Sequence, residues 1–139
     1  MPPEGQSPED PRQWLRRARS NLARASQSNV SPDVLFEDLC FDAQQAVEKA
    51  LKALLVFKSV HVPRTHAIGD LITRLTDLGL DIPAEVQEAA TLTEYAVAAR
   101  YPGPSEPVLV EDYEKAVAIA NVVISWVESL VIPPPGRVP

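Results

Sequence analysis

Cysteine is almost absent from the sequence: Cys40 is the only one, which excludes an intrachain disulfide and a cysteine-cluster metal site. No run of about 18 apolar residues occurs, so we expect no membrane-spanning helix. The first residues contain no apolar signal core, so we expect a cytoplasmic protein in a reducing compartment. Aromatic residues are also few, at three Phe, three Tyr and two Trp. The core must therefore come mainly from Leu, Val, Ile and Ala.

Positive charge is scarce as well, since 13 Lys and Arg residues stand against 19 Asp and Glu, for a formal net charge of −6. Coating of DNA depends on basic charge opposite the phosphates, so this balance argues against a general DNA-coating role. A local basic patch could still contact RNA or a nucleotide.

The common motifs of catalysis and metal binding are missing. The sequence contains no HExxH pattern, no Asp-rich calcium loop, no Walker glycines and no GxGxxG loop. His61 and His66 lie five residues apart across Pro63, and neither has helical spacing to a further ligand. Cys40 falls among apolar residues, where a thiol usually serves packing. We therefore expect no catalytic residue, no metal site and no cofactor.

Prolines divide the 139-residue chain, which has the length of one domain. Because proline is tolerated in the first turn of a helix and breaks its interior, the proline-free stretches predict helices. The five predicted helices span about 10–27, 32–59, 66–78, 83–98 and 111–131. No long stretch alternates with the period of a strand. The fold class is therefore all-α, an up-and-down antiparallel four-helix bundle with an additional short helix.

Local signals place several helix ends. Asp10 followed by Pro11 predicts the N-cap and first turn of the first helix, and Ser31-Pro32 predicts the same for the second. Gly79 predicts the end of the third helix. The folded domain should cover residues 8–131. The proline-rich ends, 1–7 and 132–139, are expected to be disordered.

The second helix has an unusually wide apolar arc, which predicts a central position in the bundle. One row on this arc is rich in small residues that let another helix approach closely: Leu39, Ala43, Ala46, Ala50, Ala53 and Phe57. The amount of apolar surface exceeds the need of one small bundle, so we expect a homodimer.

A polar row crosses the same helix at spacings of three and four, and thus lies on one face. Its members are Asp38, Asp42, Gln45, Lys49 and Lys52, with Gln44 and Glu48 in a neighbouring row. Glu48 lies four residues before Lys52, the favourable order for an ion pair. Two interpretations stay open: a solvent-exposed stripe, or a polar groove or dimer surface on the central helix.

Two further places carry candidate polar residues. Arg100 and Tyr101 precede a rigid Pro-Gly-Pro turn, where the guanidinium could bind a phosphate or carboxylate or could cap the fourth helix. His66 begins the third helix, where it could serve as a cap, form a buried hydrogen bond or contact a ligand.

Four segments together resemble one known family. They are CFDAQQAVEKALKALLVF (40–57), THAIGDLI (65–72), AARYPGPSEP (98–107) and EDYEKAVAIANVVISWVESL (111–130). This pattern is similar to that of HEPN (higher eukaryotes and prokaryotes nucleotide-binding) domains. The resemblance implies an all-α bundle that often dimerises. It also implies a partner, a minimal nucleotidyltransferase, in a two-component module in which some HEPN proteins are RNA-cleaving toxins and others are thought to bind nucleotides.

The catalytic motif of the family, an Arg followed after four to six residues by His, is not present. The corresponding positions after Arg100 hold Ser105, Glu106 and Pro107, and no other arginine in the chain satisfies the pattern. Without that His, RNA cleavage lacks the group that usually moves protons near neutral pH.

The resemblance therefore implies a non-catalytic HEPN-type module that partners a minimal nucleotidyltransferase and can bind a nucleotide. The candidate ligand-binding residues are Gln45, Lys49, Lys52, His66, Arg100 and Tyr101. One alternative is a divergent ribonuclease toxin that uses Arg100 with His66. A second alternative is a helical interaction scaffold in which the polar row is only structural.

Overall fold

The computed structural model describes residues 10–27, 31–98 and 107–132. Three long helices form the frame of the protein. These are α1 (Pro11–Ala25), α2 (Phe36–Phe57) and α6 (Val110–Val131). Shorter helical elements lie between the second and the third: α3 (Ile68–Asp77), α4 (Ala84–Gln87), the 3₁₀ helix η2 (Glu88–Thr93) and α5 (Glu94–Ala98). The predicted tails, apart from Ile132, and the Arg100–Tyr101 pair lie outside the described residues.

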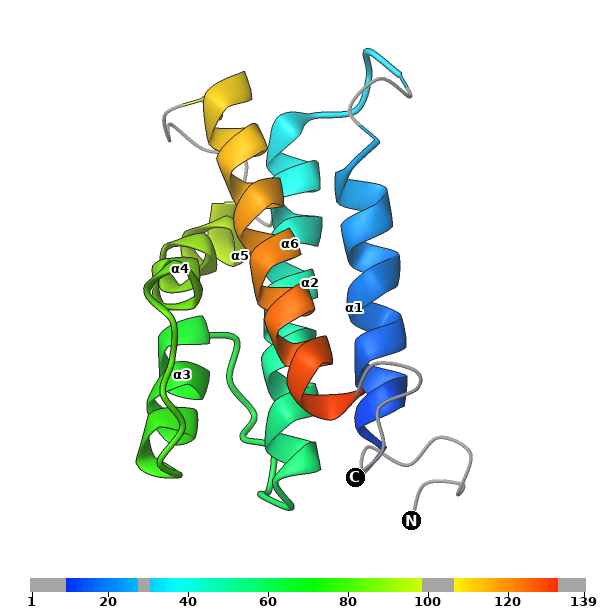
Figure 1. Ribbon diagram of the computed structural model, residues 1–139. Coiled ribbons are helices and arrows are strands. Elements are labelled where there is room, and N and C mark those ends of the chain that lie inside the picture. The colour runs from blue at the N-terminus through cyan, green and yellow to red at the C-terminus, as the bar shows by residue number, and fades with distance from the viewer. Residues whose placement is uncertain (1–9, 28–30, 99–106, 133–139) are drawn as a thin grey trace.

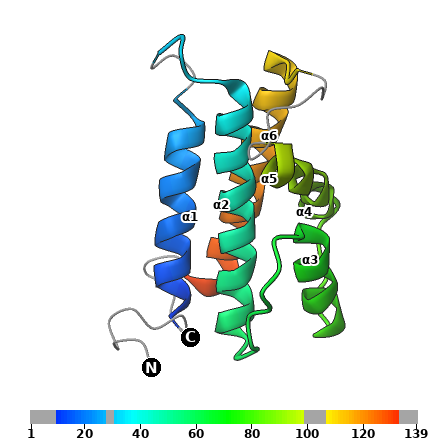
Figure 2. The same ribbon diagram turned by 180° about the vertical axis from the view of Figure 1, so that it is seen from behind.

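Helix α2 stands in the middle of the bundle (Figures 1 and 2). Helix α1 packs along one side of it and runs in the opposite direction, while α3, α4 and α5 lie on the other side. Helix α6 packs against both α1 and α2. The described residues contain helices and turns without a β-strand. The predicted all-α bundle, with its central second helix, is confirmed.

The first helix begins as predicted, and the second does not. The Asp10 carboxylate accepts a hydrogen bond from the backbone N–H of Arg12 at 2.9 Å, with Pro11 in the first turn. Helix α2 begins at Phe36, later than predicted, because Ser31 closes a separate turn. Its hydroxyl accepts from the N–H of Asp33 at 3.1 Å, and its carbonyl accepts from the N–H of Val34 at 3.2 Å.

The ends of α2 and α3 both use left-handed backbone. Gly79, the predicted end of the third helix, has a φ of +91°, a conformation that glycine adopts without steric cost. Ser59 takes the same role after α2 with a φ of +61°. The predicted fourth helix is interrupted, since its middle part is the 3₁₀ helix η2.

The small-residue row of α2 lies inside the protomer. Ala43, Ala46, Ala50 and Ala53 have no exposed surface, because the other helices of the same chain cover them. They therefore offer no surface to a second copy, and the homodimer stays a prediction that must rest on other surfaces. Phe57, at the end of the row, is 44% exposed.

Cys40 is fully buried, and burial raises the pKa of its thiol to about 12. It is thus a packing residue, as expected. None of the described helices has both the length and the apolar character that crossing a membrane requires.

Candidate functional site

The polar row of α2 is mostly covered, so the exposed-stripe interpretation is wrong for all but its first member. Asp42 and Lys52 are buried, Gln45 and Lys49 are half-buried, and Asp38 is exposed. Gln44 and Glu48 of the neighbouring row are also buried. Most of these side chains meet partners from α1 or from the segment before α3, in two separate clusters.

The first cluster, which we call the Asn21 cluster, joins α1 to the middle of α2. The Asn21 side-chain amide donates to Asp42 Oδ1 at 3.0 Å, and Lys49 Nζ donates to Asn21 Oδ1 at 2.6 Å. Arg24 pairs with Asp42 at 3.1 Å. Burial lowers the pKa of Lys49, and the nearby positive charges of Arg17 and Arg24 add to this effect against the pull of two carboxylates. The cluster satisfies the buried polar groups at the contact between the two helices.

Sequence reasoning missed Asn21, although a signal was present. Asn21 lies three residues after Ala18 and four before Ala25, so helical spacing places it on the apolar face of α1. A polar residue at such a position needs a partner from another element.

Replacing Asn21 with alanine should lower the free energy of unfolding by about 1.5–3 kcal/mol, because the Asp42 carboxylate and the Lys49 ammonium each lose a hydrogen bond. Urea unfolding at neutral pH measures this loss. Ser20→Ala, at an exposed position of the same helix, is the matched control and should change little. Equal effects of the two substitutions would contradict the role given to Asn21.

The second cluster centres on Glu48 and joins α2 to the segment before α3. Lys52 Nζ donates to Glu48 Oε2 at 2.8 Å, and the Gln44 amide donates to Glu48 Oε1 at 3.1 Å. His66 Nδ1 lies 3.1 Å from Glu48 Oε1. The Gln44 amide also lies 3.3 Å from the backbone carbonyl of His66, and Gln45 donates to Gln44 Oε1 at 2.8 Å. We call these residues the Glu48 cluster.

His66 is neither a cap nor a buried side chain. Its ring is exposed and contacts a buried carboxylate. Thr65 and Thr93 instead provide the hydroxyls at the start of α3: they accept from the backbone N–H groups of Ala67 and Ile68 at 3.0 Å each.

The neighbours of Glu48 stabilise its ionised form. Burial alone would raise its pKa, but the hydrogen bond and charge of Lys52, with the hydrogen bonds of Gln44 and His66, lower it below its usual value. Among the described residues, no three His, Cys, Asp or Glu side chains gather in a way that could hold a metal ion.

Acid should remove the stabilisation that ionised Glu48 provides. Because its folded pKa lies below the unfolded value of about 4.5, this contribution is present above that pH and is lost as the pH falls through the folded pKa. The difference in unfolding free energy between the unsubstituted protein and Glu48→Gln should therefore be greatest near neutral pH and shrink below about pH 4.5. Denaturant unfolding between pH 3 and pH 7 measures it, with exposed Glu114→Gln as the control. A difference that does not change with pH would contradict the lowered pKa.

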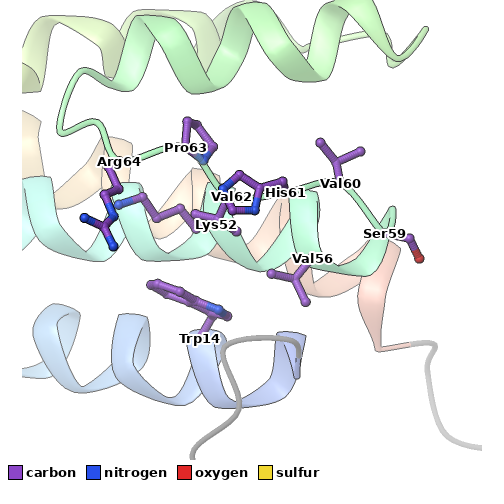
Figure 3. A pocket seen from close by; sticks show the side chains of 9 residues that line it. All are labelled: Trp14, Lys52, Val56, Ser59, Val60, His61, Val62, Pro63 and Arg64. Atoms are coloured by element: carbon purple, nitrogen blue, oxygen red, sulfur yellow. The ribbon is translucent and has the colours of Figure 1, made fainter. Parts of the chain in front are cut away.

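An open groove of about 890 Å³ lies beside the Glu48 cluster (Figure 3). Trp14 of α1 lines one side, the segment from Ser59 to Arg64 lines the other, and Lys52 and Val56 of α2 lie between them. Lys52 Nζ is 5.8 Å from the centre of the Trp14 ring, within the range of a cation–π contact. None of the described lining residues is acidic. Lys52 thus connects the Glu48 cluster to the groove.

Trp14, His61 and Arg64 were not predicted as groove residues. Trp14 lies next to the apolar row of α1, and His61 was considered only as a metal ligand. They meet because the chain turns back after α2, which helical periodicity does not reveal.

Comparison with known proteins identifies the family. The family model of the HEPN domain matches residues 11–130. The chain belongs to the HEPN domain family. The resemblance of the four sequence segments is thereby confirmed. No curated protein matches the chain.

Two solved structures are similar to this HEPN domain. TT1696 from Thermus thermophilus shares 35% sequence identity, with a TM-score of 0.75, over 86% of this chain and 96% of that one. ST0689, described as an archaeal HEPN homologue, shares 25% identity, with a TM-score of 0.70, over 88% of this chain and 98% of that one. Both similarities extend over nearly the whole described bundle.

Within this HEPN domain, the described members of the predicted ligand set divide between the two clusters. Gln45, Lys52 and His66 belong to the Glu48 cluster, from which Lys52 also reaches the groove, and Lys49 belongs to the Asn21 cluster. The predicted contributions of Arg100 and Tyr101 lie outside the described residues.

Proposed function

We propose that this HEPN domain is a non-catalytic cytoplasmic module that binds a nucleotide and acts as the partner of a minimal nucleotidyltransferase in a two-component, toxin–antitoxin-like system. The observation that supports nucleotide binding is the groove between Trp14 and Arg64. It offers an aromatic ring, the cationic side chains of Lys52 and Arg64 and the imidazole of His61, with no acidic residue among its described lining. Aromatic rings stack on bases, and cations bind phosphates, so this set of side chains fits a nucleotide.

Nucleotide binding can be measured directly on the full chain. Isothermal titration with AMP, UMP, ATP and inorganic phosphate should show binding of at least one nucleotide. The absence of heat and of protection against thermal unfolding with all of these compounds would overturn nucleotide binding.

Family membership and the non-catalytic interpretation support the proposal of a nucleotidyltransferase partner. Where a neighbouring reading frame encodes a minimal nucleotidyltransferase, co-expression should give a complex that stays together in size-exclusion chromatography with light scattering. We also propose that the HEPN chain alone is a homodimer, with a mass of about twice 15.2 kDa. Separate elution of the two proteins would contradict the partnership, and a mass of 15.2 kDa at micromolar concentration would contradict the dimer.

A divergent ribonuclease is the second candidate, and one contact favours it. His66 is exposed and is held by the buried Glu48 carboxylate, an arrangement that can orient an imidazole for proton transfer. Purified protein should nonetheless leave single-stranded RNA intact, with or without a divalent metal. Cleavage that disappears in His66→Ala or Arg100→Ala would replace the non-catalytic proposal by the ribonuclease.

A further inference from the structure

The positive charges of this acidic protein are gathered in two segments, residues 11–27 and 49–66, which contain no Asp or Glu. Nine of the 13 Lys and Arg residues occur there: Arg12, Arg16, Arg17, Arg19, Arg24, Lys49, Lys52, Lys58 and Arg64. The first segment contains α1, and the second contains the C-terminal part of α2 with the chain that follows it; these helices pack side by side (Figures 1 and 2). Arg12, Arg19, Arg24 and Lys52 pair with carboxylates. The excess of positive charge on this side therefore comes from the other cations of the two segments, among them Arg64, and it favours anions.

The groove opens on this side and is lined by two cations. Arg64 is exposed at one wall, and the buried Lys52 lies between the walls (Figure 3). An ammonium group has three donors, and the bond to Glu48 at 2.8 Å uses one of them. Lys52 can thus keep its bond to Glu48 and still donate to an anion in the groove.

The composition of the groove selects among nucleotides. A terminal phosphate monoester carries up to about two negative charges near neutral pH. Arg64 supplies a positive charge opposite it, and Lys52, whose charge already compensates Glu48, supplies a further hydrogen-bond donor. A triphosphate carries more charge and usually comes with Mg²⁺, whose preferred ligands are oxygens such as those of carboxylates. The described lining residues of the groove provide no carboxylate. Its volume of about 890 Å³ lies within the range of about 300–1,000 Å³ that is usual for small-molecule sites.

We propose that the groove is a binding site for a nucleoside 5′-monophosphate without a metal ion, with the base against Trp14 and the phosphate between Arg64 and Lys52. This inference rests on the proposed function and names the ligand class and the residues of that site. Trp14 and Arg64 lie on facing walls, so base and phosphate contact opposite sides of the groove (Figure 3). The apolar side chains of Val56, Val60 and Val62 also line the groove.

The experiment uses the full chain with Trp126→Phe, which leaves Trp14 as the only tryptophan. AMP and UMP are titrated without Mg²⁺ while the Trp14 fluorescence is recorded, and ATP with MgCl₂ and inorganic phosphate are titrated in parallel. We expect the monophosphates to quench Trp14 and to bind without Mg²⁺ more tightly than the Mg²⁺–ATP complex. Arg64→Ala should lower the affinity for the monophosphates by about tenfold or more, since it removes a charge-assisted hydrogen bond.

Lys115→Ala is the matched control, because it removes an exposed cation from α6, outside the groove lining, and should leave the affinity unchanged. Circular dichroism of both variants shows that the fold is intact. If Arg64→Ala and Lys115→Ala bind the monophosphates equally well, the groove is not the binding site, although the protein still binds nucleotides. If Mg²⁺–ATP binds more tightly than AMP and UMP, the preference for a monophosphate is wrong, but the site stands. Absence of binding by every nucleotide would overturn both this inference and the proposed nucleotide function.

Discussion

Replacing Lys52 with methionine should destabilise the protein strongly, by about 3–5 kcal/mol in the free energy of unfolding. Lys52 is only 8% exposed and is the cation that pairs with Glu48, which is itself 3% exposed. Methionine fills a similar volume but leaves the buried carboxylate without its opposite charge. The loss is then mainly the cost of an uncompensated buried charge.

The double variant Lys52→Met with Glu48→Gln separates this cause from a change in packing. Glutamine keeps the shape of Glu48 without its charge, so the double variant should be more stable than Lys52→Met alone. Urea unfolding of the two single variants and the double variant at pH 7 gives the coupling between the two sites. The pair is unimportant for stability if Lys52→Met loses less than about 1 kcal/mol of unfolding free energy. The same conclusion holds if the double variant is less stable than Lys52→Met alone.

Features that depend on neighbouring residues could be predicted from the sequence. The cap of α1 needs only Asp10 and the adjacent Pro11, and the end of α3 needs only Gly79, so both predictions are confirmed. The Glu48–Lys52 ion pair follows from a spacing of four on one helix. The start of α2 was predicted wrongly because Ser-Pro-Asp is equally suited to a helix cap and to a separate turn. The local sequence alone does not decide between them.

Features that depend on distant segments could not be predicted. The polar row of α2 was recognised by its period, but its burial depends on other segments, as the contacts of Asp42 with Asn21 and Arg24 of α1 show. The groove depends on α1, α2 and the chain after α2, three segments whose relative placement no periodicity gives. The alanine row shows the same limit, because small residues permit close packing without indicating whether the neighbour belongs to the same chain. Here the neighbour belongs to the same chain.

The apolar row and its flank on α2 provide the last prediction, a comparison of Leu51→Ala with Phe57→Ala. Leu51 has no exposed surface, and its truncation should cost about 2–5 kcal/mol through lost burial and the cavity that remains. Phe57 is the larger side chain, but it is 44% exposed, with Lys58 Nζ 6.0 Å from the centre of its ring. Its truncation should cost about 1 kcal/mol or less, since much of its surface is not in the core.

Thermal and urea unfolding of both variants, at several protein concentrations, tests this ranking. From side-chain size alone, Phe57→Ala would be expected to cost more, so the structure reverses the order. If Phe57→Ala proves as costly as Leu51→Ala only at high protein concentration, a second molecule covers Phe57 in solution, because stability that depends on concentration indicates association. If the two costs are equal at every concentration, Phe57 is part of the monomer core and its position at the exposed end of α2 is wrong.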